Sequence, residues 1–415
     1  MNHPERSTFE RCAVLSGLLT QEQIDAARAG VRWSQSDEPD TAAAPSDRQL
    51  ADRLIELGQL NAWQARQLLD GRTKFTLGPY LMLDSIGCGA MGQVFKAQHG
   101  KMGRIVAVKV LPRDKSTPEA VENFTREIRA LARLDHPRLV AALDAGLDGN
   151  VYYLVTEFVP GMDLRRLIRE RGPLETHVAA SIVSQVAEGL AYAHAQGIIH
   201  RDVKPANVLV SPSGEAKLSD LGLFGRLGNA AEEDPRYGKI VGTADYLSPD
   251  QVRDPRTPTP LWDVYSLGCT LYYAVTGKVP FPGGSTADKA RAHCEYRPLD
   301  PRRLNPSLDP DFVEAMADMM AKEPANRIGS AAEVIARMSP FLRPAAPPVI
   351  AQAVRPLTAP PLTSNESSAG DHPSAEPPDA SEPASVRWPM ALFLLTPLAL
   401  AGAALAVSWL VRLLR

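Results

Sequence analysis

Hydrophobic and polar positions divide the chain of 415 residues into four stretches of different character. Residues 1–75 carry apolar positions at helical spacing, broken by glycines that closely precede residues typical of helix N-caps. Residues 77–340 begin with alternating, β-branched runs typical of strands and continue with longer segments of helical period. Residues 343–387 are rich in Pro, Ala, Ser and acidic residues, and residues 388–411 contain no charged residue. The pattern predicts a helical region, an α+β domain, an extended tether and an apolar helix.

The N-terminal helical region contains a weak internal repeat. Residues 14–27 resemble residues 55–68, and Thr20 and Asn61 stand at matching positions as expected N-caps. Each copy therefore predicts a helix, a turn and a second helix. A role in binding a protein partner, or in packing on the following domain, is about as well supported as a folded spacer.

The two C-terminal stretches together predict a membrane anchor. The composition of residues 343–387 cannot bury a core, so we expect a disordered tether there. Residues 388–411 exceed the roughly 20 apolar residues that span a bilayer as a helix. A buried amphipathic helix is the alternative, but this segment has no polar face. We therefore expect a single transmembrane helix.

Composition and charge give no indication of nucleic-acid binding, disulfide bonds or a cysteine metal site. The net charge of −3 gives no indication of nucleic-acid binding. The hydrophobic content of 44% fits a chain with a substantial globular core. The four cysteines lack CxxC or metal-ligand spacing, so neither a disulfide framework nor a cysteine metal site is expected.

A glycine-rich segment, IGCGAMGQVF at residues 86–95, predicts a site for phosphate. Glycine lets backbone N–H groups approach phosphate without a clash of Cβ. Dinucleotide-binding folds use the same GxGxxG spacing, but there a helix follows, whereas strand-like residues follow here. We therefore expect a β-hairpin over a nucleotide, with Lys109 at the end of the next strand reaching its phosphates.

The stretch IIHRDVKPANVL, residues 198–209, has the composition of a catalytic loop for phosphoryl transfer to a hydroxyl. Asp202 can accept the hydroxyl proton, Lys204 can neutralise charge on the phosphate, and Asn207 can coordinate a metal ion. Through these motifs the sequence, from about Leu77 to Pro340, resembles the eukaryotic-like serine/threonine protein kinases of bacteria.

The resemblance implies a two-lobed α+β fold. The N-lobe would hold an antiparallel sheet plus one helix, the C-lobe would be mostly helical, and ATP would lie between them. The implied reaction is transfer of the ATP γ-phosphate to Ser or Thr hydroxyls of proteins, including the kinase itself. Mg²⁺ would assist, with Mn²⁺ as a possible substitute. Lys204 favours Ser and Thr as substrates, because tyrosine kinases usually lack a lysine at this position.

The resemblance also assigns site residues. The catalytic group would be Asp202 and Lys204, together with an ion pair between Lys109 and Glu127. Asn207 and Asp220 would hold Mg²⁺. The nucleotide would be bound by Ile86, Gly87, Cys88, Gly89, Ala90, Met91, Gly92, Gln93, Val94, Ala107, Lys109, Glu157 and Val159, with the backbone of the last two facing adenine.

Further residues match supporting positions of the family. Thr243 resembles the threonine that contacts Asp202 and Lys204, and His200 resembles a structural histidine beneath the metal-binding loop. Asp263 matches the aspartate that holds the backbone of the catalytic loop. The segment SPD replaces the usual APE, and we expect its aspartate, at position 250, still to reach the arginine at position 327. The metal-binding segment Asp220-Leu221-Gly222 replaces the family's usual DFG, and its leucine is apolar like the phenylalanine that it replaces.

The activation segment contains neither Ser nor Thr between residues 223 and 242. We hypothesise that its acidic run, residues 232–234, pairs with Arg201 and takes the place of a phosphorylated residue. A solvated acidic loop is the alternative.

A pseudokinase, retaining the fold as a membrane-tethered scaffold, is the rival interpretation of the whole chain. It is disfavoured because Lys109, Asp202, Asn207 and Asp220 are all present. The first residues lack the apolar core of a secretory signal, and a kinase needs cytosolic ATP. We therefore expect a single-pass, tail-anchored protein of the cell membrane with a cytoplasmic kinase domain. Expected partners are protein substrates, the membrane, a second copy through dimerisation or clustering, and a protein bound by residues 1–75.

Overall fold

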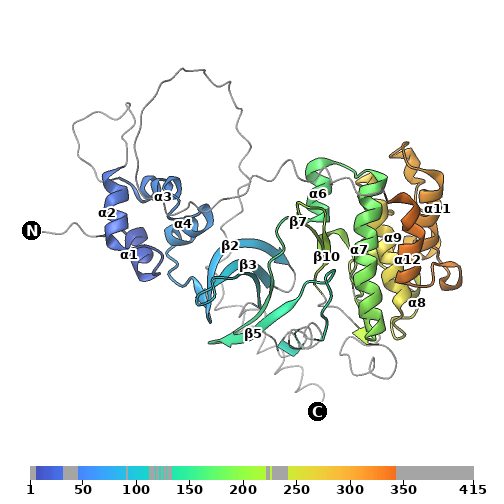
Figure 1. The fold of residues 1–415 in the computed structure, drawn as a ribbon, viewed down its shortest axis with the longest axis horizontal. Helices are drawn as coiled ribbons and strands as arrows, with labels where there is room; N and C mark the ends of the chain where they lie inside the picture. The colour runs from blue at the N-terminus through green and yellow to red at the C-terminus, as the bar shows by residue number, and fades with distance from the viewer. Residues whose placement is uncertain are drawn as a thin grey trace, which may run out of the picture. The chain divides into compact units, whose positions relative to one another are not determined.

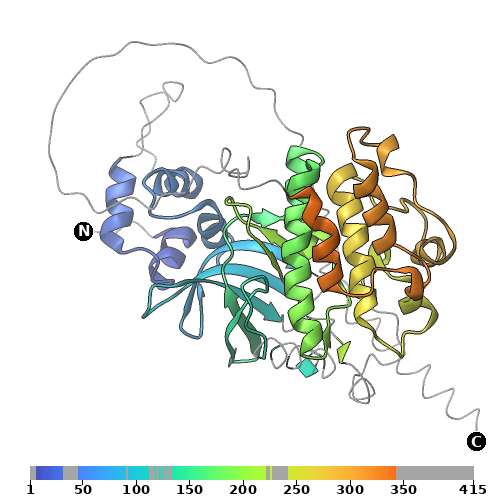
Figure 2. The ribbon, with the colours of Figure 1, turned by 45° about the vertical axis from the view of Figure 1, so that its right-hand side comes forward.

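The computed structural model of the chain describes residues 6–30, 45–89, 92–111, 117, 121–122, 125, 128, 133–220, 225–226 and 242–342. Figures 1 and 2 show a group of short N-terminal helices, a curled sheet and a helical part within these residues. Among the described residues no helix is long and apolar enough to cross a membrane. The tether expected at 343–387 and the anchor expected at 388–411 lie outside the described residues.

Four helices form the N-terminal part: α1 (Thr8–Leu15), α2 (Gln21–Ala29), α3 (Asp47–Glu56) and α4 (Ala62–Leu69). Each begins at a capping box, in which a polar side chain and the residue three positions on exchange hydrogen bonds with backbone amides. The N-caps predicted at Thr20 and Asn61 are confirmed. Gly17 and Gly58 have φ of 71° and 66°, so glycine suits both turns of the repeat. Phe9, Ile24, Leu50, Leu54 and Leu68 are fully buried between the helices.

An antiparallel sheet follows, with strand order β1-β2-β3-β4-β6-β5. Its strands are β1 (Thr76–Leu77), β2 (Tyr80–Gly89), β3 (Gly92–His99), β4 (Ile105–Leu111), β5 (Ala142–Asp148) and β6 (Val151–Glu157). The strands predicted after the glycine-rich segment, and the hairpin predicted at it, are confirmed. The one helix expected in the N-lobe lies largely outside the described residues, although Val121 and Ile128 are helical and pack against the core.

The C-lobe is mostly helical. Its helices are α6 (Leu164–Arg171), α7 (Thr176–Ala195), α8 (Pro249–Arg253), α9 (Pro260–Thr276), α10 (Thr286–Glu295), α11 (Pro310–Met319) and α12 (Ala331–Met338). Helices α7 and α9 form its centre, and α12 lies beside both (Figures 1 and 2). Nearly every residue of α9 is buried, in agreement with its lack of a polar face.

Two small antiparallel sheets in this lobe position its loops. They are formed by β7 (Met162–Asp163), β9 (Val208–Val210) and β10 (Ala216–Leu218), and by β8 (Ile198–Ile199) with β11 (Gly225–Arg226). The loop at residues 200–207 joins β8 to β9, and Asp220 lies two residues after the end of β10. Because β9 and β10 pair, the strands bring the catalytic loop and Asp220 to the same edge of the lobe. The two-lobed α+β arrangement of the described residues matches the fold expected from sequence.

Candidate active site

Asp202 lies at the centre of the site. It is buried, and its Oδ2 accepts a hydrogen bond from Lys204 Nζ at 2.5 Å. Its Oδ1 accepts two more, from the backbone N–H of Thr243 at 3.0 Å and from Thr243 Oγ1 at 2.9 Å. Lys204 Nζ also donates to Thr243 Oγ1 at 2.7 Å. The contacts expected for Thr243 are thus confirmed, and they fix the Asp202 carboxylate in one orientation.

Asp263 holds the backbone that carries Asp202. Its carboxylate is fully buried and accepts from the backbone N–H of His200 and of Arg201, both at 2.8 Å. Burial alone would raise the pKa of Asp263, but the hydrogen bond and charge of His194, helped by His200, lower it below its ordinary value. The residue therefore stays ionised and stabilises Arg201 at a φ of 64°, which is rare for a residue with a Cβ. The expectation for Asp263 is confirmed.

His200 joins the catalytic loop to the segment that carries Asp220. The ring is fully buried, with Nε2 at 3.0 Å from the carbonyl oxygen of Ser219 and Nδ1 at 3.2 Å from the amide nitrogen of Asp202. A buried ring with both nitrogens in backbone contacts suits a structural role, as expected.

Asn207 and Asp220 both offer oxygen ligands for a metal ion. The Nδ2 of Asn207 donates to the backbone oxygen of Asp202 at 2.9 Å and to its Oδ2 at 3.3 Å, so the opposite amide oxygen remains for a cation. Asp220 has a φ of 59° and a half-exposed side chain. One amide oxygen and one carboxylate fit Mg²⁺, which keeps waters and substrate phosphate oxygens as further ligands. No cluster of three or more His, Cys, Asp or Glu suited to a metal occurs among the described residues.

Lys109 forms an ion pair with Asp220. Its Nζ lies 3.1 Å from Asp220 Oδ1, and the lysine side chain is largely buried. The walls of the cleft desolvate Asp220, which alone would raise its pKa, but the charge and hydrogen bond of Lys109 outweigh this and lower the pKa. Glu127 lies outside the described residues, so its ion pair with Lys109 stays a prediction.

The glycine-rich segment forms the expected hairpin. Its register pairs Gly87 with Val94, Cys88 with Gln93 and Gly89 with Gly92. Ala90 and Met91 lie outside the described residues, as does the side chain of Cys88. Ile86 is exposed at the base of the hairpin.

The opposite wall of the cleft comes from β4 and the segment after β6. Ala107 pairs with Thr156 between the two strands, next to Glu157 and Val159. The side chain of Glu157 is engaged elsewhere, because it accepts from the backbone N–H of Ala141 at 2.9 Å and from Lys217 Nζ at 2.7 Å. Its backbone N–H also donates to the backbone oxygen of Ala141 at 3.0 Å, so only the carbonyl oxygen of Glu157 is available for adenine. The ion pair with Lys217 was not predicted from sequence, because no motif links the two segments.

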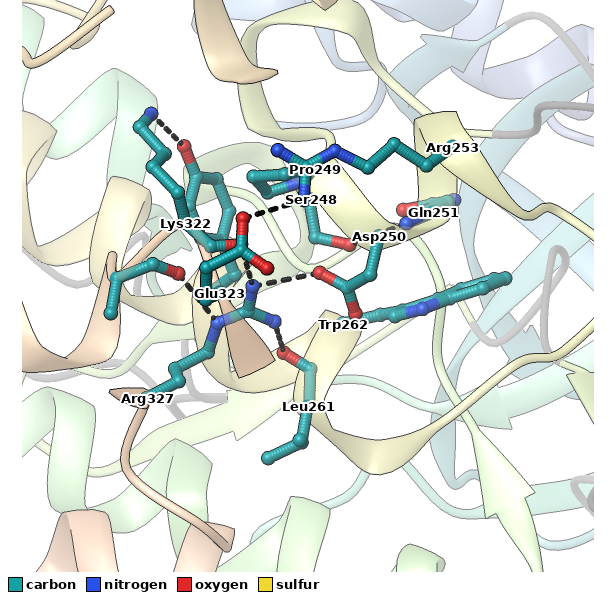
Figure 3. A network of polar contacts seen from close by, with 12 residues as sticks. Ser248, Pro249, Asp250, Gln251, Arg253, Leu261, Trp262, Lys322, Glu323 and Arg327 are labelled. Atoms are coloured by element: carbon teal, nitrogen blue, oxygen red, sulfur yellow. Dashed lines mark hydrogen bonds and ion pairs between the residues drawn. The ribbon is translucent and has the colours of Figure 1, made fainter. Parts of the chain in front are cut away.

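The SPD segment at the start of α8 is anchored by Arg327 (Figure 3). Arg327 Nη2 donates to Asp250 Oδ1 at 2.7 Å, so the pairing predicted across the shorter side chain is confirmed. The guanidinium also donates to the backbone oxygens of Leu261 and Ala321, at 2.8 and 3.0 Å. These bonds join α8, α9 and the segment after α11.

The same network contains contacts that sequence reasoning missed. Arg253 pairs with Glu323 at 2.9 Å (Figure 3), and Lys322 Nζ donates to the Tyr265 hydroxyl at 3.0 Å and to the backbone oxygen of His293 at 2.7 Å. The only sequence signal was the position of Glu323 and Lys322 a few residues before Arg327. The acidic run 232–234, with its hypothesised pairing to Arg201, lies outside the described residues.

Comparisons with known proteins agree with this geometry. Residues 80–339 match the family described as protein kinase domain. Serine/threonine-protein kinase PknB of Mycolicibacterium smegmatis is 35% identical over 329 residues, covering 76% of this chain and 52% of the relative. Probable serine/threonine-protein kinases of Clostridium perfringens and Corynebacterium efficiens are 38% and 40% identical, covering 62% and 61% of this chain and 37% and 39% of theirs.

The chain thus spans about half or less of the length of these curated relatives. The family match covers more than half of the chain itself, and it includes the catalytic loop, Asp220 and the SPD segment. The chain therefore belongs to the protein kinase family.

Proposed function

We propose that the chain is a serine/threonine protein kinase, which transfers the γ-phosphate of ATP to protein hydroxyls and to itself. The substrate oxygen attacks the γ-phosphorus, the bond to the β–γ bridging oxygen breaks and leaves ADP, and Asp202 accepts the hydroxyl proton. Mg²⁺, or Mn²⁺ in its place, would be held by Asn207 and Asp220 and would neutralise phosphate charge. Lys109 would bind the α- and β-phosphates.

One observation carries this proposal: the Asp202 carboxylate is bound by Lys204 and Thr243 together. An acid held in this way can orient a hydroxyl, while the lysine beside it can neutralise the transferred phosphate. Thr243 is followed by a 3-10 helix at Ala244–Tyr246 and by α8. In protein kinases this part of the chain lines the groove for the peptide substrate. Protein Ser and Thr are therefore the substrate class that we favour.

Transfer from labelled ATP tests the proposal. The purified full chain would be incubated with Mg²⁺ and a general acceptor protein, beside Asp202→Ala, followed by phosphoamino-acid analysis. We expect phosphoserine or phosphothreonine from the wild type alone. Phosphotyrosine would contradict the substrate class, and equal transfer by both chains would contradict the role of Asp202.

A membrane-tethered pseudokinase scaffold is the second candidate. It would bind ATP without transfer, and its partners would be sought through the N-terminal helices. The completeness of the described site, with Lys109, Asp202, Asn207 and Asp220 all in place, argues against it.

We also propose that residues 388–411 anchor the chain in the cell membrane with the kinase domain in the cytoplasm. The uncharged run of this segment supports the anchor, and the need for cytosolic ATP supports the orientation. Protease treatment of intact spheroplasts should leave the kinase domain undigested, and digestion of that domain would refute the orientation. Clustering in the membrane is tested by comparing full-length and anchor-deleted chains at equal concentration, with and without vesicles.

A further inference from the structure

One face of α4 contacts both strands of the glycine-rich hairpin. The side-chain Nδ2 of Asn61 donates to the backbone oxygen of Leu83 in β2 at 2.5 Å. The Trp63 ring packs on Phe95 of β3, with ring centroids 5.8 Å apart, and on Phe75 at 5.7 Å. Trp63 packs against the hydrophobic core of the N-terminal helices and also against that of the sheet. Helix α4 therefore joins the two cores at the hairpin.

The Asn61 contact falls on an irregularity of β2. Met82 and Asp84 both have register partners on β3, whereas Leu83 between them has none. Such a β-bulge bends its strand and leaves a residue outside the ladder, whose backbone groups need other partners. Asn61 supplies a partner for the carbonyl of Leu83. Strand β2 is therefore supported at Leu83 from outside the kinase domain, and a second register shift follows between Ser85 and Gly87.

The Trp63 contact supports the same hairpin from the face opposite the nucleotide. Side chains alternate between the faces of a strand, so Phe95 and its neighbour Val94 point to opposite sides. Phe95 pairs with Val108, which is buried in the core of the sheet, whereas Val94 pairs with Lys109 on the side of the cleft. Trp63 thus packs on Phe95, the neighbour of Val94, on the face of the sheet opposite the expected ATP site.

The internal repeat shows that a capped helix needs neither the amide N–H of Asn61 nor the ring of Trp63. Thr20, which matches Asn61, caps α2 through the same capping box but has no side-chain amide. Glu22, which matches Trp63, is exposed. The second copy therefore differs from the first at the two positions that contact the hairpin.

We propose that Asn61 and Trp63 are positioning residues for ATP binding. They hold the β2–β3 hairpin in the conformation in which its glycine backbone covers the phosphates. The effect on ATP rests on the proposed kinase function, whereas the effect on the hairpin does not. The N-terminal helices would therefore act as a built-in support of the glycine-rich segment rather than as a spacer.

Asn61→Asp in the full chain is the informative substitution. Aspartate is isosteric and is a good N-cap, but it has no N–H to donate and places a charged oxygen against the Leu83 carbonyl. Thr20→Ala is the matched control, because it removes a cap from the first copy and leaves the hairpin contact intact. Trp63→Leu is the second variant, which retains an apolar side chain and removes the ring contacts.

Two measurements separate positioning from a structural role. Hydrogen exchange without nucleotide should be faster in β2 and β3 of Asn61→Asp and Trp63→Leu, and unchanged there in Thr20→Ala. In labelled-ATP transfer, Asn61→Asp should raise the KM for ATP about fivefold, as expected for one lost hydrogen bond, with a smaller change of kcat. A general loss of folding would instead lower kcat through the active fraction and leave the KM unchanged.

Unchanged exchange in β2 and β3 of both α4 variants would overturn the proposal, whether or not the chain is an active kinase. Should Asn61→Asp exchange faster throughout the described residues, Asn61→Ser replaces it, since serine keeps a cap without adding charge. Should the wild type transfer no phosphate, ATP affinity measured by calorimetric titration takes the place of the KM. Equal ATP affinity in the wild type and Asn61→Asp would then overturn the positioning role.

Discussion

Arg327 Nη2 donates to Asp250 Oδ1 at 2.7 Å, and the arginine side chain is fully buried (Figure 3). Aspartate is one methylene shorter than the glutamate expected at this position, yet it makes the contact because α8 begins beside α9 and the segment after α11. The carboxylate neutralises a guanidinium that would otherwise carry an uncompensated buried charge. The pair therefore links the start of α8 to the core of the C-lobe.

Asp250→Ala should consequently destabilise the chain. Removing one partner of a buried pair leaves the other charge unpaired, so we expect a loss of about 3 kcal/mol in the free energy of unfolding. Arg253→Ala is the matched control, because its pair with Glu323 is largely exposed and should contribute less than about 1 kcal/mol. Urea unfolding followed by circular dichroism measures both. Equal effects of the two substitutions would contradict the importance of the buried pair.

Thr243→Val should slow phosphoryl transfer without weakening ATP binding. Valine keeps the shape and the backbone N–H bond to Asp202, but it removes the Oγ1 contacts with Asp202 and Lys204. A less firmly oriented carboxylate should lower kcat by about tenfold to hundredfold. Thr243→Ser, which retains the hydroxyl, should stay close to the wild type. Steady-state kinetics of the full chain decides this, and equal kcat for the valine and serine variants would count against the role of the hydroxyl.

The sequence predicted the contacts of residues in short motifs better than the contacts of residues outside them. Asp202, Lys204 and Thr243 stand in short motifs whose chemistry is readable from residue type, and their contacts are present. The partners of Glu157 and Leu83, namely Lys217 and Asn61, could not be found in this way. Each of these contacts joins segments distant in the chain, and it depends on which face of a strand or helix is turned inwards.

The fold shows the same contrast between features set by local sequence and features set by contacts of distant segments. Strands β3 and β4 were expected from alternation and β-branched residues, because these patterns reflect local backbone preference. The bulge at Leu83 was not expected, since a residue that leaves the ladder has no signature of its own in the sequence. Its position depends on pairing with β3 and on the docking of α4.

Asp220→Asn should remove the effect of Mg²⁺ on ATP binding. The neighbouring charge of Lys109 lowers the pKa of Asp220, so the wild-type residue offers a carboxylate to the cation at neutral pH. We expect Mg²⁺ to raise the affinity of the wild type for ATP, and this gain should fall by about tenfold or more in the variant. Calorimetric titration with ATP, in Mg²⁺ or in a chelator, measures the difference. An undiminished Mg²⁺ effect in Asp220→Asn would exclude it as a metal ligand.

The buried His293 should make the stability of the C-lobe depend on pH. Its Nδ1 lies 3.0 Å from the Tyr265 hydroxyl, and burial together with the positive charge of Lys322 lowers its pKa to about 4. The ordinary pKa of histidine in an unfolded chain is about 6.5. Between these values the unfolded chain binds more protons than the folded chain, so stability falls as the pH falls from about 6.5 to 4.

His293→Gln separates this effect from the titration of carboxylates in the same range. Glutamine can accept the Tyr265 hydrogen bond through its amide oxygen but binds no proton. Between pH 7 and pH 4 the wild type should lose about 3 kcal/mol more unfolding free energy than the variant. Urea unfolding of both full-length chains across this range gives the comparison. Parallel pH curves would show that His293 does not become protonated on unfolding, and the assignment of a neutral buried imidazole would then be wrong.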